Sequence, residues 1–125
     1  MKRTLIILVV GLLSVGCLTP EQKQKRLRDS VVGEYVRPPS SRQPVPVKFV
    51  VLENGAWESY KNSRKPVYSK WVISNGELHV INNNGYQWIY RINSDKSITY
   101  IAYIDDEKRR TDFSKEKQFT YKKIK

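Results

Sequence analysis

Two side chains in this sequence could do chemistry that no other residue offers: the single cysteine, Cys17, and the single histidine, His79. A lone thiol cannot form a disulfide within the chain, and one Cys with one His is too small a set for a structural zinc site. We therefore expect no disulfide, no metal and no cofactor. The sequence contains no GxSxG, HExxH, P-loop or GxGxxG pattern. His79 alternates with Leu78 and Val80, so we expect it to face solvent or the rim of a pocket, and we expect no enzyme.

Cys17 follows an apolar run, and this position suggests a different use for its thiol. Residues 1–3 are Met-Lys-Arg, and residues 4–13 are apolar but too few to span a bilayer comfortably, as in a secretory signal peptide. The segment Leu13-Ser14-Val15-Gly16-Cys17 resembles the lipobox of bacterial lipoproteins, with Ser14 where that family usually has Leu. The resemblance implies cleavage after Gly16 by signal peptidase II and diacylation of Cys17. An uncleaved anchor or an ordinary secretory leader is the alternative.

The resemblance also implies a location. Two or three acyl chains hold a protein on a membrane, whereas one chain gives only reversible binding. Leu18 follows the cysteine, rather than the Asp that tends to retain lipoproteins at the inner membrane. We therefore expect a lipid-anchored protein of the cell envelope, on the periplasmic face of the outer membrane if the host has two membranes. The membrane is then a partner, and nucleic acid is not.

The chain is strongly basic. Its formal net charge is +11, of which Lys2 and Arg3 of the leader supply two. Such a charge favours anionic partners, here acidic lipid or a polymer of the envelope such as lipopolysaccharide phosphate or teichoic acid. The alternative is that the basic residues merely keep a small β protein soluble.

Three segments follow from these patterns: residues 1–16 as the signal peptide, residues 17–30 as the lipidated cysteine with a basic linker or short helix, and residues 31–125 as a β domain. Thr19, Pro20 and Gln22 have the pattern of a capping box, which predicts a helix from Pro20 to about Arg28. Leu27 is its only sizeable apolar residue. We expect a solvated spacer, or else a basic segment that presses on anionic head groups.

The remainder predicts an all-β fold, a single small antiparallel meander of eight or nine strands. Asn54-Gly55, Asn75-Gly76 and Asn84-Gly85 are typical of two-residue hairpin turns, since Asn and Gly tolerate positive φ. The strands expected between the turns are 31–37, 47–53, 56–61, 68–74, 77–82, 86–93, 97–104, 109–113 and 118–124.

Gly33-Glu34-Tyr35 at the start of the meander is similar to the GxW of small lipocalin-like proteins, with Tyr in place of Trp. The resemblance implies a closed or partly open barrel. The connection Pro38 to Pro46 contains four prolines. It is expected to be an exposed extended loop, or alternatively a proline-recognition ligand or a lid over the barrel.

The three Trp and eight Tyr are the remaining candidates for a site. We expect some of them to line a cavity, with basic residues nearby supplying charge. The function expected is non-enzymatic binding of an anionic envelope component or a small apolar ligand. The alternative is a protein-interaction module, either an enzyme inhibitor or an accessory subunit of an envelope assembly. The candidate residues are Trp57, Trp71, Trp88 and Tyr90 for the cavity, and Lys65, Lys70 and Arg91 for charge.

Overall fold

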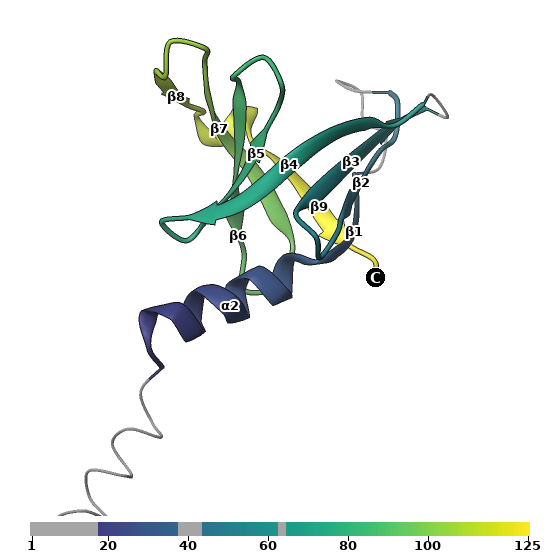
Figure 1. The fold of residues 1–125 in the computed structure, drawn as a ribbon. Coiled ribbons are helices and arrows are strands. Elements are labelled where there is room, and N and C mark those ends of the chain that lie inside the picture. Colours follow the sequence, from purple (N-terminus) through teal and green to yellow (C-terminus); the bar gives the residue numbers. More distant parts are fainter. Residues whose placement is uncertain (1–17, 38–43, 63–64) are drawn as a thin grey trace, which may run out of the picture.

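Nine β-strands follow one α-helix in the computed structural model, which describes residues 18–37, 44–62 and 65–125 (Figure 1). Residues 1–17, with the expected signal peptide and Cys17, lie outside the described residues, and so does most of the proline-rich connection. Every strand that we expected is present, with boundaries within two residues of the prediction. The elements are α2 (Pro20–Val31), β1 (Gly33–Arg37), β2 (Val47–Val51), β3 (Ala56–Lys61), β4 (Val67–Ser74), β5 (Glu77–Ile81), β6 (Gln87–Ile92), β7 (Ile98–Ile104), β8 (Arg110–Asp112), the 3₁₀ turn η1 (Lys115–Lys117) and β9 (Phe119–Lys123).

The strands close into a barrel. Neighbouring strands from β1 to β7 pair antiparallel in chain order, and β1 and β7 both also pair with β9, which completes a ring of eight strands. The extra strand β8 pairs with residues 102–104 of β7, beside the segment 98–100 that pairs with β9. The all-β meander is thereby confirmed, and the small closed barrel is consistent with a lipocalin-like fold.

The Asn-Gly turns are of two kinds. Asn75-Gly76 is the expected two-residue turn, with φ of 52° and 75°. At Asn54-Gly55 the glycine alone has positive φ, and Leu52 N–H donates to the carbonyl of Ala56 across a longer loop. Asn84-Gly85 repeats this geometry. The two-residue prediction is therefore wrong at these two sites, because the Asn precedes the left-handed position there instead of occupying it.

A β-bulge explains why β7 is apolar on both faces. The register with β6 shifts between Ile89, which pairs with Ala102, and Tyr90, which pairs with Tyr100. Ile101 is the extra residue on β7, so the alternation of inward and outward side chains changes phase there. Tyr90 and Tyr100 then face each other inside the barrel, with ring centres 5.2 Å apart.

Helix α2 covers one end of the barrel (Figure 1). The predicted capping box is confirmed, with Gln22 N–H donating to Thr19 Oγ1 and Thr19 N–H to Gln22 Oε1. The expected solvated spacer is wrong: Leu27 packs against the core, and Val31 is completely buried in it. The helix therefore continues to Val31 instead of ending near Arg28.

Hydrogen bonds to the last helical carbonyls hold α2 in place. The Tyr35 hydroxyl donates to the Val31 carbonyl at 2.7 Å, and Lys123 Nζ donates to the Ser30 carbonyl at 2.8 Å. These carbonyls lack partners within a helix, so side chains from β1 and β9 satisfy them. Within the described residues, no helix has the length and apolar character needed to cross a bilayer.

The opposite end of the barrel is called the mouth below. It is the end at which β1 and β3 finish, at Arg37 and Lys61, and at which β2 and β4 begin, at Val47 and Val67. The connections 38–46 and 62–66 leave from this end. Whether the first of them acts as a lid stays a prediction, because residues 38–43 lie outside the described residues.

Candidate functional site

A cavity of about 320 Å³ opens at the mouth, inside the barrel. Six aromatic side chains form most of its wall, contributed by β2, β3, β6, β7 and β9. Two valines and two serines complete it. The lining residues are Phe49, Trp57, Trp88, Tyr90, Tyr100, Tyr121, Val47, Val67, Ser59 and Ser69.

The aromatic wall is held by contacts among its own rings. Tyr90 lies at its centre, with ring centroids 5.4 Å from Trp57, 6.0 Å from Phe49 and 6.1 Å from Tyr121. Phe49 also lies 4.6 Å from Trp57. Tilted and edge-on pairs at such distances are favourable beyond the area they bury. The wall is therefore preorganised, and a ligand would not have to order it.

Two serines make room for the cavity. Ser59 pairs across the sheet with Phe49, and Ser69 pairs with Trp57. Each places a small side chain beside a large one on the inward face of the barrel. A closed barrel of eight strands is just wide enough for side chains to fill, so small residues at these two positions leave space that larger ones would occupy.

The cavity offers hydroxyl groups that the protein itself does not use. Among the described residues, the hydroxyls of Tyr90, Tyr100 and Tyr121 form no hydrogen bond with the protein. Burial raises the pKa of Tyr100 to about 12 and also raises the pKa of Tyr90 well above its ordinary value of 10.0, so both phenols stay neutral at any physiological pH. Desolvation also raises the pKa of Tyr121, opposed by the nearby charge of Arg37. The three phenols can therefore donate hydrogen bonds to a bound ligand.

Three of the four aromatic residues predicted from the sequence line this cavity: Trp57, Trp88 and Tyr90. Phe49, Tyr100 and Tyr121 also line it without having been predicted, and so do the two serines. Alternation along β3 and β4 could have indicated the serines, because Ser59 is two residues from Trp57 and Ser69 is two residues from Trp71.

Trp71 does not belong to the cavity, so this prediction is corrected. Its ring is 1% exposed, and its Nε1 donates to the Leu52 carbonyl at 2.8 Å. The Arg28 guanidinium of α2 lies 5.0 Å from the ring centre. Trp71 faces inward as expected, but it lies near the helix-covered end and fixes α2 against the barrel.

The three predicted basic residues are not brought together. Lys65 lies at the mouth, two residues before Val67. Lys70 is exposed on the outer face of β4, between the inward-facing Ser69 and Trp71. Arg91 is exposed near the other end, where its Nε donates to Asn93 Oδ1. The structure therefore gives only Lys65 a position beside the cavity.

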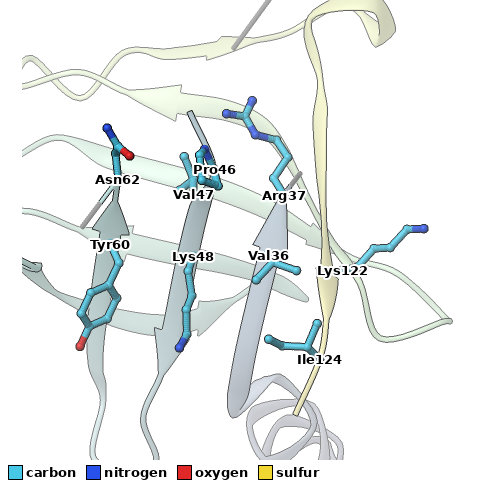
Figure 2. A pocket seen from close by; sticks show the side chains of 9 residues that line it. All are labelled: Val36, Arg37, Pro46, Val47, Lys48, Tyr60, Asn62, Lys122 and Ile124. Carbon is cyan, nitrogen blue, oxygen red and sulfur yellow. The ribbon is translucent and has the colours of Figure 1, made fainter. Parts of the chain in front are cut away.

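A larger hollow, of about 500 Å³, lies across the outer face of β9, β1, β2 and β3 (Figure 2). Val36 and Ile124 form its apolar floor. Two of its polar groups already have partners, because Lys48 pairs with Glu34 at 2.6 Å and the Tyr60 hydroxyl donates to Glu58. Since a ligand that used these groups would have to displace their contacts, the barrel cavity is the better candidate site.

His79 faces outward on β5 as predicted, but it is only 9% exposed, so the expectation of a solvent-facing or pocket-rim side chain is wrong. Its Nδ1 lies 3.0 Å from Gln87 Oε1, and its Nε2 lies 3.6 Å from Glu77 Oε1. Arg110 of β8 donates to both carboxylate oxygens of Glu77, at 2.9 and 3.0 Å. This cluster joins β8 to β5 across the outside of the barrel, and none of its members lines the cavity.

The Glu77–Arg110 pair predicts a pH-dependent part of the stability. Arg110 holds the pKa of the Glu77 carboxyl below its ordinary value of 4.5. A depressed carboxyl contributes stability above its unfolded pKa and loses that contribution as pH falls through its folded pKa. We expect Glu77→Gln to lower the free energy of unfolding by about 1 kcal/mol at pH 7, with the difference shrinking below pH 4.5. Urea unfolding across a series of buffers from neutral to acidic pH checks this, and a difference that grows on acidification would contradict it.

Comparisons with protein-family models, with curated proteins and with solved structures gave no match. The interpretation of the site therefore depends on this chain's own residues and geometry.

Proposed function

We propose that this protein is a lipid-anchored, non-enzymatic binding protein of the cell envelope, whose barrel takes up a small, largely apolar ligand. The observation that carries the proposal is the aromatic cavity at the mouth. Its volume of about 320 Å³ lies at the lower end of the range of roughly 300–1,000 Å³ that is usual for ligand sites. Apolar walls with a few convergent hydroxyls are also typical of such sites.

The anchor is the second part of the proposal, and it depends on the sequence around Cys17. Acylation of the lone cysteine would give the barrel a fixed location without any membrane-spanning helix. The basic charge of the chain supports an anionic setting such as an envelope surface.

The binding proposal is tested by filling the cavity. A neutral fluorescent probe, N-phenyl-1-naphthylamine, is titrated into the wild type and into Ser69→Phe, in which a ring replaces a small inward side chain beside Trp57. We expect at least a tenfold loss of affinity. Val72→Phe on the same strand is the matched control, because Val72 faces outward and is 41% exposed. Its affinity should equal that of the wild type.

A second filling variant, Ser59→Leu, covers the case in which Ser69→Phe does not fold. Circular dichroism and urea unfolding establish that each variant is native. A folded, filled barrel that still binds the probe as the wild type does would overturn the cavity as the ligand site.

A second candidate function, the binding of another protein, is favoured by one observation at the mouth. Val67 and Tyr68 on β4 are 62% and 63% exposed. This part of β4 pairs with β3 only, because pairing with β5 begins at Lys70. An exposed apolar strand edge can accept an added strand from a partner. Equal probe binding by wild type, Ser69→Phe and Val72→Phe would favour this candidate over ligand uptake.

A further inference from the structure

Positive charge borders the mouth of the cavity, whereas its lining contains no carboxylate among the described residues. On β3 the inward-facing positions are Trp57, Ser59 and Lys61. The first two line the cavity, and the exposed ammonium group of Lys61 follows them at the rim. Lys65, in the next connection, is also exposed at this rim.

Arg37 adds charge from the other side of the mouth. It is the last inward-facing residue of β1 and is 6% exposed. Its guanidinium carbon lies 4.8 Å from the ring centre of Phe119 and 5.6 Å from that of Tyr121, which lines the cavity. Low-dielectric walls weaken screening, so this buried charge raises the potential inside the cavity more than an exposed one would.

The remaining charges at this end of the barrel do not cancel this potential. Lys115 and Lys117 flank Glu116 in η1, just before β9. The acidic turn 105–107 at the tip of the β7–β8 hairpin is partly neutralised, because Arg109 contacts Asp105 at 3.0 Å and Glu107 at 2.8 Å. Basic residues therefore outnumber acidic ones around the mouth.

We propose that the ligand of the cavity is an anionic amphiphile. Its apolar part, a single chain or ring system, lies among the aromatic side chains, and its negatively charged head lies at the mouth near Lys61 and Lys65. This inference rests on the proposed function. The small cavity volume favours one apolar chain over the two chains of a phospholipid.

Two probes that share one aromatic skeleton test the charge. They are 1-anilinonaphthalene-8-sulfonate and the neutral N-phenyl-1-naphthylamine, titrated into the full chain carrying Cys17→Ser, which has no acyl chains to bind the probes. Binding in the cavity is measured as the probe fluorescence that is lost when Ser69→Phe is added. Binding to the apolar leader is the same in both chains, so it cancels in this difference. We expect the sulfonate to bind about tenfold more tightly at low salt, with the preference largely lost at about 1 M salt, where screening is strong.

The double variant Lys61→Gln/Lys65→Gln should reduce the preference at least threefold, with the remainder due to Arg37, while changing the affinity for the neutral probe much less. Lys70→Gln/Arg91→Gln is the matched control, because it removes the same charge from exposed positions away from the mouth. Equal binding of both probes to the wild type would overturn this inference and leave the proposed function standing. Absence of any signal that depends on Ser69 would overturn the proposed function itself.

Competition separates the two sources of such a ligand. Sodium decanoate supplies a free single-chain anion, and dihexanoyl-phosphatidylglycerol supplies a soluble two-chain lipid. We expect decanoate to displace the sulfonate probe at least tenfold more effectively. Equal or better displacement by the phospholipid would overturn the assignment to a single chain.

Discussion

Gly33→Ala is expected to lower the free energy of unfolding by about 3 kcal/mol or more, since it combines a backbone strain with a steric overlap. Gly33 has a φ of +149°, which side-chain-bearing residues rarely adopt. A Cβ atom at this position would overlap the carbonyl oxygen of Lys125 and lie 2.7 Å from Lys123 Cε. The carbonyl cannot simply move away, because Glu34 N–H donates to it at 3.2 Å and Ile124 N–H donates to the Glu34 carbonyl at 2.8 Å.

Urea unfolding followed by tryptophan fluorescence measures this effect. Gly76→Ala is the control, since Gly76 also has positive φ, 75°, but a Cβ atom there would meet nothing within 4 Å beyond its chain neighbours. The free energy of unfolding of Gly76→Ala should fall only by the cost of placing a side-chain-bearing residue at positive φ, about 1 kcal/mol. Equal losses for the two variants would show that the close approach of β1 to the C-terminal residues is unimportant.

Cys17→Ser, exported behind a leader that an ordinary signal peptidase removes, is expected to move the protein from the membrane fraction to the soluble fraction almost completely. The proposed anchor needs the sulfur atom, and each buried methylene of an acyl chain contributes about 0.8 kcal/mol to membrane binding. Two chains therefore hold the protein by an amount that the basic surface alone cannot supply. Fractionation after a wash in high salt measures the change, since salt removes electrostatic adsorption.

Ser14→Leu is the control for the anchor, because it changes the same segment but keeps the cysteine. It should remain with the membrane. Mass spectrometry of the exported chain gives an independent measurement, with acyl chains expected on Cys17. An unmodified thiol, or a serine variant that stays on washed membranes, would contradict the lipoprotein proposal.

Alternation and turn chemistry predicted every strand of the barrel, because each depends on residues that are neighbours in the chain. Closure of the barrel, in contrast, depends on residues that are far apart in sequence. Tyr35 pairs with Lys123, and Val36 pairs with Lys122. Nothing in the local pattern of β1 or β9 specifies that partner, so the sequence left open whether the barrel was closed.

The site was predicted in part for a similar reason. Trp57 and Trp71 both face inward on adjacent strands, and alternation does not distinguish them. Their heights in the barrel differ because of the register between strands: Trp57 pairs with Ser69 and lies at the cavity, while Trp71 pairs with Val80 nearer the helix. Register and tilt belong to the closed barrel as a whole, so a single strand cannot reveal them.

The packing of α2 against the barrel could not be predicted from the sequence either. A single apolar residue, Leu27, gave no amphipathic stripe. The hydrogen bonds that hold the helix come from side chains of the barrel. The Tyr35 hydroxyl and the Lys123 ammonium group donate to backbone carbonyls of the helix. Every residue has a carbonyl, so the sequence of the helix cannot show which of them will accept such bonds.

The position of α2 has a consequence for how the proposed ligand would enter and leave the barrel. The helix begins three residues after Cys17 and covers the end of the barrel opposite its mouth. With acyl chains in the bilayer at Cys17, the blocked end would sit against the lipid and the entrance would point into the aqueous compartment. Molecules would then be exchanged with soluble carriers or with a facing surface, and lateral entry from the supporting leaflet would be prevented.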